Sequence, residues 1–127
     1  MSVTHYERLG GEKAIRALVN RFYDLMDTLP EAQAIRQIHA PDLAEARVKL
    51  FLFLTGWMGG PQLYVEKYGH PRLRQRHIGF PIGIRERDEW MLCMTRAMQD
   101  TEVEPALQQE LTQAFFKTAD FMRNQPD

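Results

Sequence analysis

The chain has 127 residues, of which 44% are hydrophobic and 26% charged, a composition typical of one globular domain with a substantial core. We therefore expect residues 1–127 to form a single domain. Its 16 Lys and Arg are balanced by 17 Asp and Glu, so the formal net charge is -1. This balance argues against a nucleic-acid-binding protein, which usually has a strong basic excess.

The sequence also lacks the patterns of membrane-spanning and exported proteins. Its longest apolar run, residues 50–54, is far below the roughly 18 residues that a transmembrane helix needs. The N-terminus has no basic and then apolar signal-peptide pattern. The single cysteine, Cys93, can form no intrachain disulfide. We expect a soluble cytoplasmic protein, a monomer or homodimer, that binds neither membrane nor nucleic acid.

The N-terminal part predicts a long amphipathic helix. Residues 1–11 look like a short lead-in, and helical periodicity begins at Glu12. Pro30 either ends this helix or opens the next one. A shorter helical piece precedes a turn at His39. The inner face of the long helix is expected to contain Ile15, Leu18, Val19, Phe22, Leu25 and Met26.

A second long helix is predicted after this turn. Asp42 and Glu45 have the spacing of a capping box, in which the Asp carboxylate accepts a free N–H of the first turn. The sequence Gly59-Gly60-Pro61 should end the helix, because glycine favours a left-handed cap and proline cannot continue a helix. The inner face is expected to contain Leu43, Ala46, Leu50, Phe53, Leu54 and Trp57, with Lys49 at its edge.

The connection over residues 61–83 contains three prolines and three glycines, so we expect it to be functional or to hold a short helix of its own. Two more helices are predicted, one from about Arg85 and one from near Pro105. No segment shows strand alternation, so the fold class is all-α. The inner faces are expected to contain Trp90 or Met91, Met94, Ala97 and Met98, and then Leu107, Leu111, Ala114, Phe115, Phe121 and Met122.

His77 carries the strongest functional signal. Leu73 and His77 are four residues apart and share one helical face, whereas Arg72 and Arg76 share another. The residues that follow are largely apolar and include Ile78, Phe80 and Ile82. A histidine in apolar surroundings with cations nearby suits haem, whose iron binds an imidazole nitrogen and whose propionates bind Arg or Lys. The predicted propionate partners are Arg76 and, from the neighbouring helix, Lys49.

Other residues allow more than one interpretation. Tyr23 and Trp90 lie on the inner faces of two helices, where they are either core residues or two polar groups that converge on a small ligand. His39 is most simply a loop histidine, with a pocket role as the alternative. A zinc site from Glu66, His70 and His77 is weaker, because it lacks a recognisable ligand set. A haem-free helical interaction module, colourless when purified, is the alternative of another class.

Several segments resemble the group II truncated haemoglobins. They are YERLGG at 6–11, NRFYDLM at 20–26, GWMGGPQLY at 56–64, GHPRLRQRHIGFPI at 69–82 and ERDEWMLCM at 86–94. The last helix matches only in its apolar pattern. The resemblance implies a truncated globin fold, a two-over-two helical sandwich around haem b. It also implies that His77 is the proximal ligand and that Tyr23, His39 and Trp90 are the distal polar residues.

The resemblance extends to the residues around the haem. Ala46 falls where many globins have a distal His or Gln, and Leu50 lines the distal side one turn further on. Phe22 and Phe53 are expected to complete the distal pocket. The residues expected to contact haem are Lys49, Leu54, Trp57, Tyr64, Leu73, Arg76, Ile78, Phe80, Ile82 and Met94.

The function implied by this resemblance is the binding of dioxygen and other small diatomic ligands, including carbon monoxide and nitric oxide. Trp90 and Tyr23 would donate hydrogen bonds to the bound ligand. Oxygen binding or transport is one purpose. The alternative is haem-dependent redox catalysis, as a nitric oxide dioxygenase or a peroxidase-like enzyme, which would need an unidentified reductase to return electrons to the iron.

Overall fold

The computed structural model describes residues 3–126, and this part of the chain contains helices and no β-strand, as predicted for an all-α protein. Three long helices were expected to begin near Glu12, Arg85 and Pro105, and the structure confirms all three. The helices are α1 (His5–Leu9), α2 (Glu12–Thr28), the 3-10 helix η1 (Pro30–Ala32), α3 (Gln33–Gln37), α4 (Ala44–Trp57), α5 (Leu63–Tyr68), α6 (Leu73–His77), α7 (Ile84–Asp100) and α8 (Pro105–Phe121).

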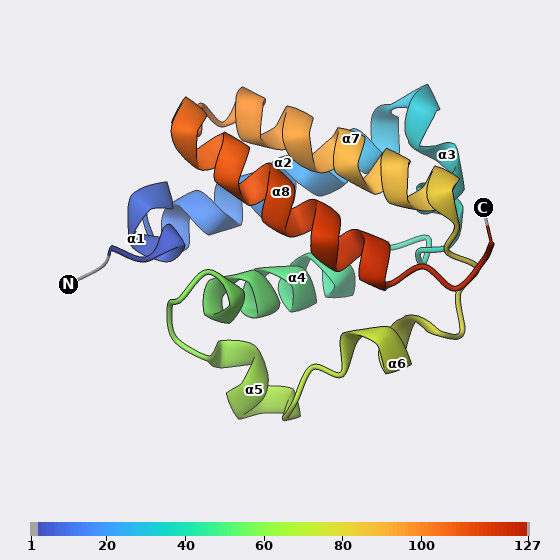
Figure 1. The fold of residues 1–127 in the computed structure, drawn as a ribbon, viewed down its shortest axis with the longest axis horizontal. Coiled ribbons are helices and arrows are strands. Elements are labelled where there is room, and N and C mark those ends of the chain that lie inside the picture. The colour runs from blue at the N-terminus through green and yellow to red at the C-terminus, as the bar shows by residue number, and fades with distance from the viewer. Residues whose placement is uncertain (1–2, 127) are drawn as a thin grey trace.

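The core forms where the long helices cross. Helix α2 packs against α7 and α4, and α7 packs against α8. Figure 1 shows α2, α7 and α8 on one side of the molecule, α4 next to them, and α5 and α6 at the opposite edge. All six residues predicted for the inner face of α2 are buried, which confirms the periodicity: Ile15, Leu18, Val19, Phe22, Leu25 and Met26.

The predicted lead-in is a helix in its described part, since residues 5–9 form α1; residues 1 and 2 lie outside the described chain. The Thr4 hydroxyl caps α1 by accepting the Glu7 N–H at 3.1 Å. The turn that follows needs glycine, because Gly10 has φ of 121°. A helix of five residues is too short to produce a periodic apolar pattern, which is why the sequence did not reveal it.

Helix α4 begins differently from the predicted capping box. Leu43 is its N-cap residue, but the Asp42 carboxylate does accept a free N–H of the first turn as predicted, that of Ala44 at 2.9 Å. Glu45 does not return to cap the backbone, because its carboxylate pairs with Lys49 Nζ at 2.8 Å. The helix ends at the predicted stop. There Gly60 lies against the Tyr6 ring, and a Cβ at this position would come within 2.6 Å of it.

The connection over residues 61–83 was expected to be functional or to hold a short helix, and it contains two short helices. Both α5 and α6 lie within it, and α6 has no buried residue. At the end of α8 the prediction for Phe121 is wrong, since its side chain is 59% exposed. It lies on the solvent side of α8, under the Arg74 guanidinium at 5.5 Å, whereas the next residue, Met122, is buried. None of the helices in residues 3–126 has the length and apolar character needed to cross a membrane.

Candidate functional site

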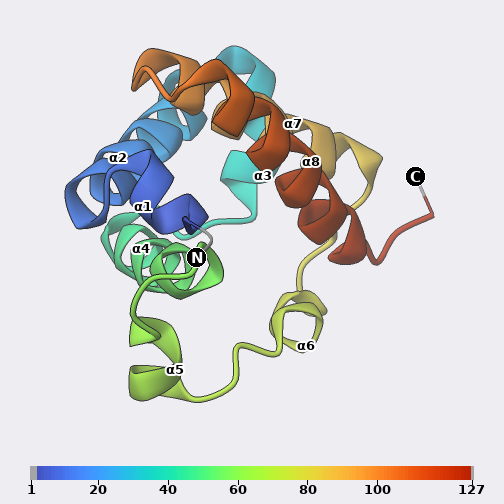
Figure 2. The same cartoon turned by 60° about the vertical axis from the view of Figure 1, so that its left-hand side comes forward.

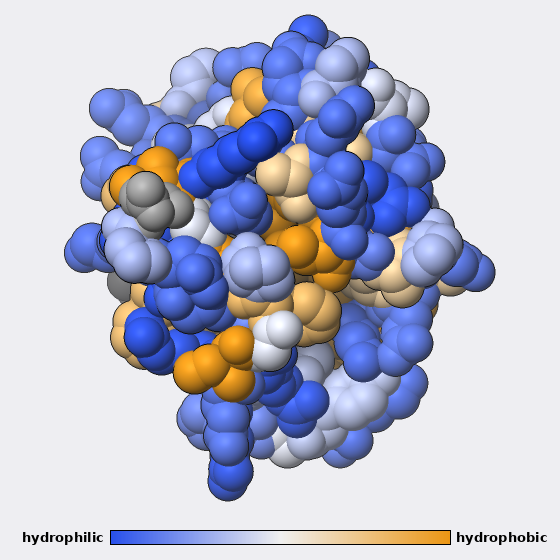
Figure 3. Space-filling model, turned by 90° about the vertical axis from the view of Figure 1, so that its right-hand side faces the viewer, coloured by the Kyte–Doolittle hydropathy of each residue, from blue (hydrophilic) through white to orange (hydrophobic). Residues whose placement is uncertain are grey.

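A cavity of about 690 Å³ lies between the long helices and α6. This volume is within the roughly 300–1,000 Å³ of typical small-molecule sites. Its walls come from α2, α3 and the turn after it, α4, α6 and the chain that follows, α7, and the end of α8. In Figure 2, α6 lies apart from the long helices and is joined to α7 by an extended stretch of chain. Figure 3 shows a face of the molecule on which apolar residues lie in a hollow rimmed by hydrophilic ones.

The structure brings eleven of the predicted site residues to this cavity, from five separate segments. They are Tyr23, His39, Ala46, Lys49, Leu50, Phe53, Leu73, His77, Phe80, Ile82 and Trp90. Seven others do not line it: Phe22, Leu54, Trp57, Tyr64, Arg76, Ile78 and Met94.

Most of these seven residues support the cavity from behind. Phe22, Leu54 and Met94 are almost completely buried in the core. The Phe22 ring packs 4.9 Å from that of Tyr23 and 5.1 Å from that of Trp90, between centroids. Trp57 and Tyr64 also pack on aromatic neighbours rather than on the cavity, Trp57 on Phe115 at 4.8 Å and Tyr64 on Phe53 at 6.1 Å.

Ile78 and Arg76 instead point away from the cavity. The Ile78 side chain is 65% exposed. The Arg76 guanidinium donates to the Pro71 carbonyl at 2.8 Å and lies 5.8 Å above the Tyr64 ring. Neighbours of His77 in the sequence alternate around a short helix, so they cannot all face the same space.

The cavity also has lining residues that the sequence did not single out as site residues. Met122 was predicted only as an inward apolar residue, and Ile35 and Ile38 belong to the short helical piece that was predicted before His39. Thr118 and Ala119 lie outside the predicted apolar stripe of α8, and no sequence signal marks them. The further lining residues are Ala40, Asp42, Glu45, Glu86 and Arg87.

His77 has the geometry of a metal-binding imidazole. Its Nδ1 lies 2.6 Å from the Leu73 carbonyl oxygen, one helical turn earlier. A carbonyl oxygen only accepts, so Nδ1 carries the proton and donates this hydrogen bond. In the neutral imidazole this leaves the lone pair on Nε2, which is the arrangement that a hydrogen bond from the other ring nitrogen gives to histidine ligands of metals.

His39 is held in the same way at another wall. Its Nδ1 donates to the Ile35 carbonyl at 2.8 Å, and its ring lies 5.9 Å from that of Tyr23 between centroids. Burial lowers the pKa of His39, and the nearby Arg36 acts in the same direction. At neutral pH the imidazole is therefore neutral, with Nε2 as a hydrogen-bond acceptor.

Tyr23 and Trp90 bring two polar groups to the cavity. Tyr23 is 5% exposed, and burial raises the pKa of its phenol, so the hydroxyl stays protonated and can donate. Neither the Tyr23 hydroxyl nor the Trp90 indole N–H makes a hydrogen bond to any other residue between 3 and 126. Trp90 is half-buried, and neither of the two polar atoms is sealed off by protein. Each can therefore donate to a polar ligand in the cavity that it lines.

The residues of this cavity fit a haem group. Haem needs an axial nitrogen, an apolar space for the ring, and cations or polar groups at its acidic edge. His77 Nε2 and apolar residues such as Leu50 and Phe53 meet the first two needs. Two cations line the cavity, and each has a carboxylate partner in the protein: Lys49 pairs with Glu45 at 2.8 Å and Arg87 with Asp120 at 2.7 Å.

The alternative zinc site has no comparable geometry. His70 is exposed, and its Nδ1 accepts the Arg72 N–H at 3.1 Å. Across residues 3–126 no group of three or more His, Cys, Asp or Glu side chains is arranged to hold a metal ion.

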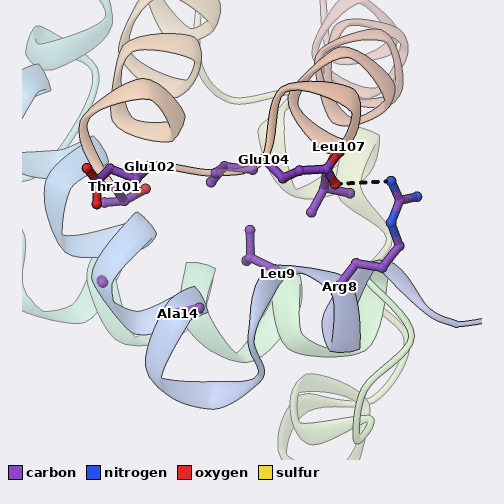
Figure 4. A pocket seen from close by; sticks show the side chains of 9 residues that line it. Arg8, Leu9, Ala14, Thr101, Glu102, Glu104 and Leu107 are labelled. Carbon is purple, nitrogen blue, oxygen red and sulfur yellow. Dashed lines mark ion pairs between the residues drawn. The ribbon is translucent and has the colours of Figure 1, made fainter.

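A second, smaller cavity of about 220 Å³ lies at the other end of the molecule, between α1, α2 and the start of α8. Figure 4 shows Arg8, Leu9 and Leu107 around it, with Glu102 and Glu104 on the connection above. Arg8 pairs with Glu104 at 3.7 Å and with Glu110 at 2.9 Å. Because these polar groups satisfy one another, this cavity offers less to a ligand than the larger one.

Comparison with known proteins agrees with this geometry. Residues 4–124 match the model of the family described as bacterial-like globin. The chain is 50% identical to the group II 2-on-2 hemoglobin from Agrobacterium tumefaciens, with a TM-score of 0.94 over 98% of this chain and 96% of that one. The cold-adapted truncated hemoglobin of Pseudoalteromonas haloplanktis is 44% identical, with a TM-score of 0.94 over 97% and 99% of the two chains.

A group 2 truncated hemoglobin from Bacillus subtilis is 38% identical over 122 residues, which cover 96% of this chain and 89% of the relative. These matches confirm the expected truncated globin fold and the predicted family resemblance. A haem cofactor is a property of this family. The chain therefore belongs to the bacterial-like globins and, within them, to the group II truncated haemoglobins.

Proposed function

We propose that the chain binds haem b through His77 Nε2 and uses the rest of the cavity to hold dioxygen or another small diatomic ligand. Bound haem supplies an iron with an open coordination position for such a ligand. The observation that carries the proposal is the pairing, in one cavity, of a histidine with a free Nε2 and two donors that have no protein partner, Tyr23 and Trp90.

Each donor has a separate role in this proposal. The Tyr23 hydroxyl and the Trp90 N–H donate hydrogen bonds to the ligand, each worth roughly 0.5–1.5 kcal/mol net and more toward a charged acceptor. His39 Nε2 is a hydrogen-bond acceptor on the same side of the cavity as the Tyr23 ring. Ala46 and Leu50 leave space for the ligand and exclude water.

Relatives support oxygen as the ligand. A solved haemoglobin from Bacillus subtilis, 37% identical to this chain with a TM-score of 0.87, is described as truncated and oxygen-avid. Two donors toward one ligand are expected to slow its release by more than tenfold, because about 1.4 kcal/mol corresponds to a factor of ten. Slow release is less suited to oxygen transport than to chemistry on the ligand or sensing. Cytoplasmic location and a monomeric or dimeric state stay predictions.

Redox catalysis is the second candidate, as nitric oxide dioxygenation or peroxidase-like chemistry. The same donors would serve it, and it would need a protein that returns electrons. Arg72, Arg74 and Arg76 favour this candidate, because they are exposed close to His77 in the chain and could bind such a partner.

The absorption spectrum of protein expressed with adequate haem tests the proposal, before and after dithionite and then carbon monoxide. We expect a strong Soret band that shifts on reduction and again with carbon monoxide. A colourless protein that ignores added haemin would overturn the proposal and favour the haem-free interaction module.

A further inference from the structure

Positive charge is concentrated in one part of the chain. Residues 67–85 contain five of the 16 Lys and Arg and none of the 17 Asp and Glu. The other residues therefore hold 11 basic and 17 acidic side chains, a net charge of -6, whereas this stretch has a net charge of +5. A protein of nearly zero net charge is thus strongly polarised, and the positive part includes α6 and His77.

Four of these cations lie on α5, on α6 and at the start of α6, and we call them together the basic rim: Lys67, Arg72, Arg74 and Arg76. All four are exposed, and none is within ion-pair distance of a carboxylate of the described residues. Arg74 donates to the Phe121 carbonyl at 2.9 Å and Arg76 to the Pro71 carbonyl, which orients the guanidiniums and leaves their charge intact.

The basic rim differs in this respect from most arginines elsewhere in the molecule. Arg21 pairs with Asp100 at 2.8 Å, and Arg36 pairs with Asp27 at 2.9 Å. Arg47 also has a carboxylate partner at 2.8 Å. Surface charges in this protein are therefore mostly paired locally, whereas the charges of the basic rim remain available to an external partner.

Apolar side chains lie next to these cations. Ile78 is 65% exposed and Phe80 44% exposed, directly after His77 in the chain. Phe80 also lines the cavity, whereas Ile78 faces the solvent. A small apolar centre with charges around it is the usual composition of a protein–protein interface, and the charges set the approach and orientation of the partner.

We propose that the basic rim, with Ile78 and Phe80, is the docking surface for an acidic electron-donor protein that carries a flavin or an iron–sulfur cluster. This inference rests on the proposed haem site. Docking there places the donor beside the segment that carries His77. With haem held by His77, the reduced donor would give up one electron and the ferric iron would take it up to become ferrous; no bond would break and no proton would be needed.

Two other partners with negative charge fit this surface less well. A membrane-surface helix needs an extended apolar face, but α6 has five residues and only two strongly exposed apolar side chains follow it. The net charge of -6 on the other residues would also repel anionic lipid and the long phosphate backbone of nucleic acid. A compact acidic protein can instead contact the basic rim alone.

The test compares two double variants that change net charge equally. Lys67→Glu/Arg72→Glu alters the basic rim at two side chains that make no hydrogen bond within the described structure. Lys13→Glu/Arg96→Glu is the control, since both residues are exposed and unpaired among residues 3–126 and lie on α2 and α7, away from α6 (Figure 1). Haem content and the Soret band are checked first in every protein.

Two measurements then follow, with an acidic [2Fe–2S] ferredoxin and a flavodoxin as probes. The first is binding by calorimetry at low and high salt, and the second is the rate at which the reduced probe reduces the haem. We expect salt-sensitive binding that weakens about tenfold or more in the basic-rim variant and less than about twofold in the control. The reduction rate should fall in parallel, measured below saturation.

Three results would overturn the docking surface. They are equal weakening in both double variants, unchanged binding in the basic-rim variant, and no salt-dependent binding to either probe. Binding to vesicles of phosphatidylcholine and phosphatidylserine that is lost only in the basic-rim variant, without probe binding, would assign the surface to a membrane instead. A colourless protein would overturn both this inference and the proposed function, whereas the other results leave the haem site intact.

Discussion

The cavity wall made by α2 and α7 comes from two helices of 17 residues each, and their inner faces are buried in the core. The wall that carries His77 comes from α6, which has five residues and none buried. Phe22 contacts both Tyr23 and Trp90 on the first wall, so hydrophobic packing fixes the two donors. The difference indicates that the first wall is preformed, whereas the second depends on hydrogen bonds and on its ligand.

Asn124, after the end of α8, provides most of those hydrogen bonds. Its amide Nδ2 donates to the Phe80 carbonyl at 2.7 Å and to that of His77 at 3.3 Å. Its Oδ1 accepts the Ile82 N–H at 3.0 Å, and its backbone N–H donates to the Ile82 carbonyl at 2.8 Å. One polar side chain thus holds the residues on both sides of Phe80, where the other wall uses a whole apolar core.

Replacing His77 should have the largest effect, since it removes the only axial ligand that the α6 wall is proposed to supply. We expect His77→Ala to lower haem affinity by more than about 100-fold, beyond the roughly 10–100-fold cost of losing an outer partner of a metal ligand. Haem transfer to an apoglobin acceptor measures this. The control is His70→Ala, on the same connection but outside the cavity. A variant that keeps the wild-type ferrous spectrum and haem affinity would contradict the proximal assignment.

On the preformed wall, Trp90→Phe should leave haem binding unchanged and weaken ligand binding. Loss of one hydrogen bond to a partly charged ligand is expected to raise the oxygen dissociation rate about tenfold. Stopped-flow displacement of oxygen by carbon monoxide measures the rate. Trp57→Phe is the matched control, because Trp57 stacks on Phe115 outside the cavity. An unchanged rate in Trp90→Phe would remove Trp90 from ligand stabilisation.

The difference in length between these helices also determines which of them could be predicted from the sequence. Periodicity predicted α2, α7 and α8 and most of their buried residues, because a long amphipathic helix must bury one face. It did not predict α1 or the exposure of Phe121, since helix ends and short helices carry too few residues for a pattern. Asp42 and Glu45 matched a capping box in spacing, but Lys49 was a competing partner that spacing alone does not reveal.

The composition of the site was predictable only in part, for a related reason. Periodicity identifies a buried side chain but does not say whether protein or ligand covers it. Phe22 and Met94 were therefore expected at the ligand and lie in the core, whereas Thr118 and Ala119 line the cavity without any signal. Asn124 could not be predicted either, because its role depends on hydrogen bonds to carbonyls more than 40 residues away.

Replacing Asn124 should loosen the wall that carries His77 without changing the wall made by α2 and α7. Asn124→Ala leaves the Ile82 N–H and the Phe80 carbonyl without these partners, at a cost of about 1–3 kcal/mol if they stay shielded from water. Part of this cost should appear in the position of His77, so we expect haem dissociation to accelerate severalfold with little change in the oxygen dissociation rate. Gln113→Ala, at an exposed position of α8, is the control. A faster oxygen release with unchanged haem retention would contradict the division between the walls.

The smallest expected effect concerns His39, in the turn that follows α3. Burial lowers its pKa in the folded protein, below the value of about 6.5 for an unfolded chain. Unfolding therefore takes up a proton below about pH 6.5, so the folded state loses stability as the pH falls through that value and is unaffected above it. We expect His39→Gln to remove part of this loss between pH 7.5 and 5.5, measured from urea midpoints of the haem-loaded protein. His70→Gln, which changes an exposed histidine, should lose as much stability as the wild type. If His39→Gln did so too, His39 would titrate equally in both states, and its Nε2 would be open to water instead of enclosed beside Tyr23.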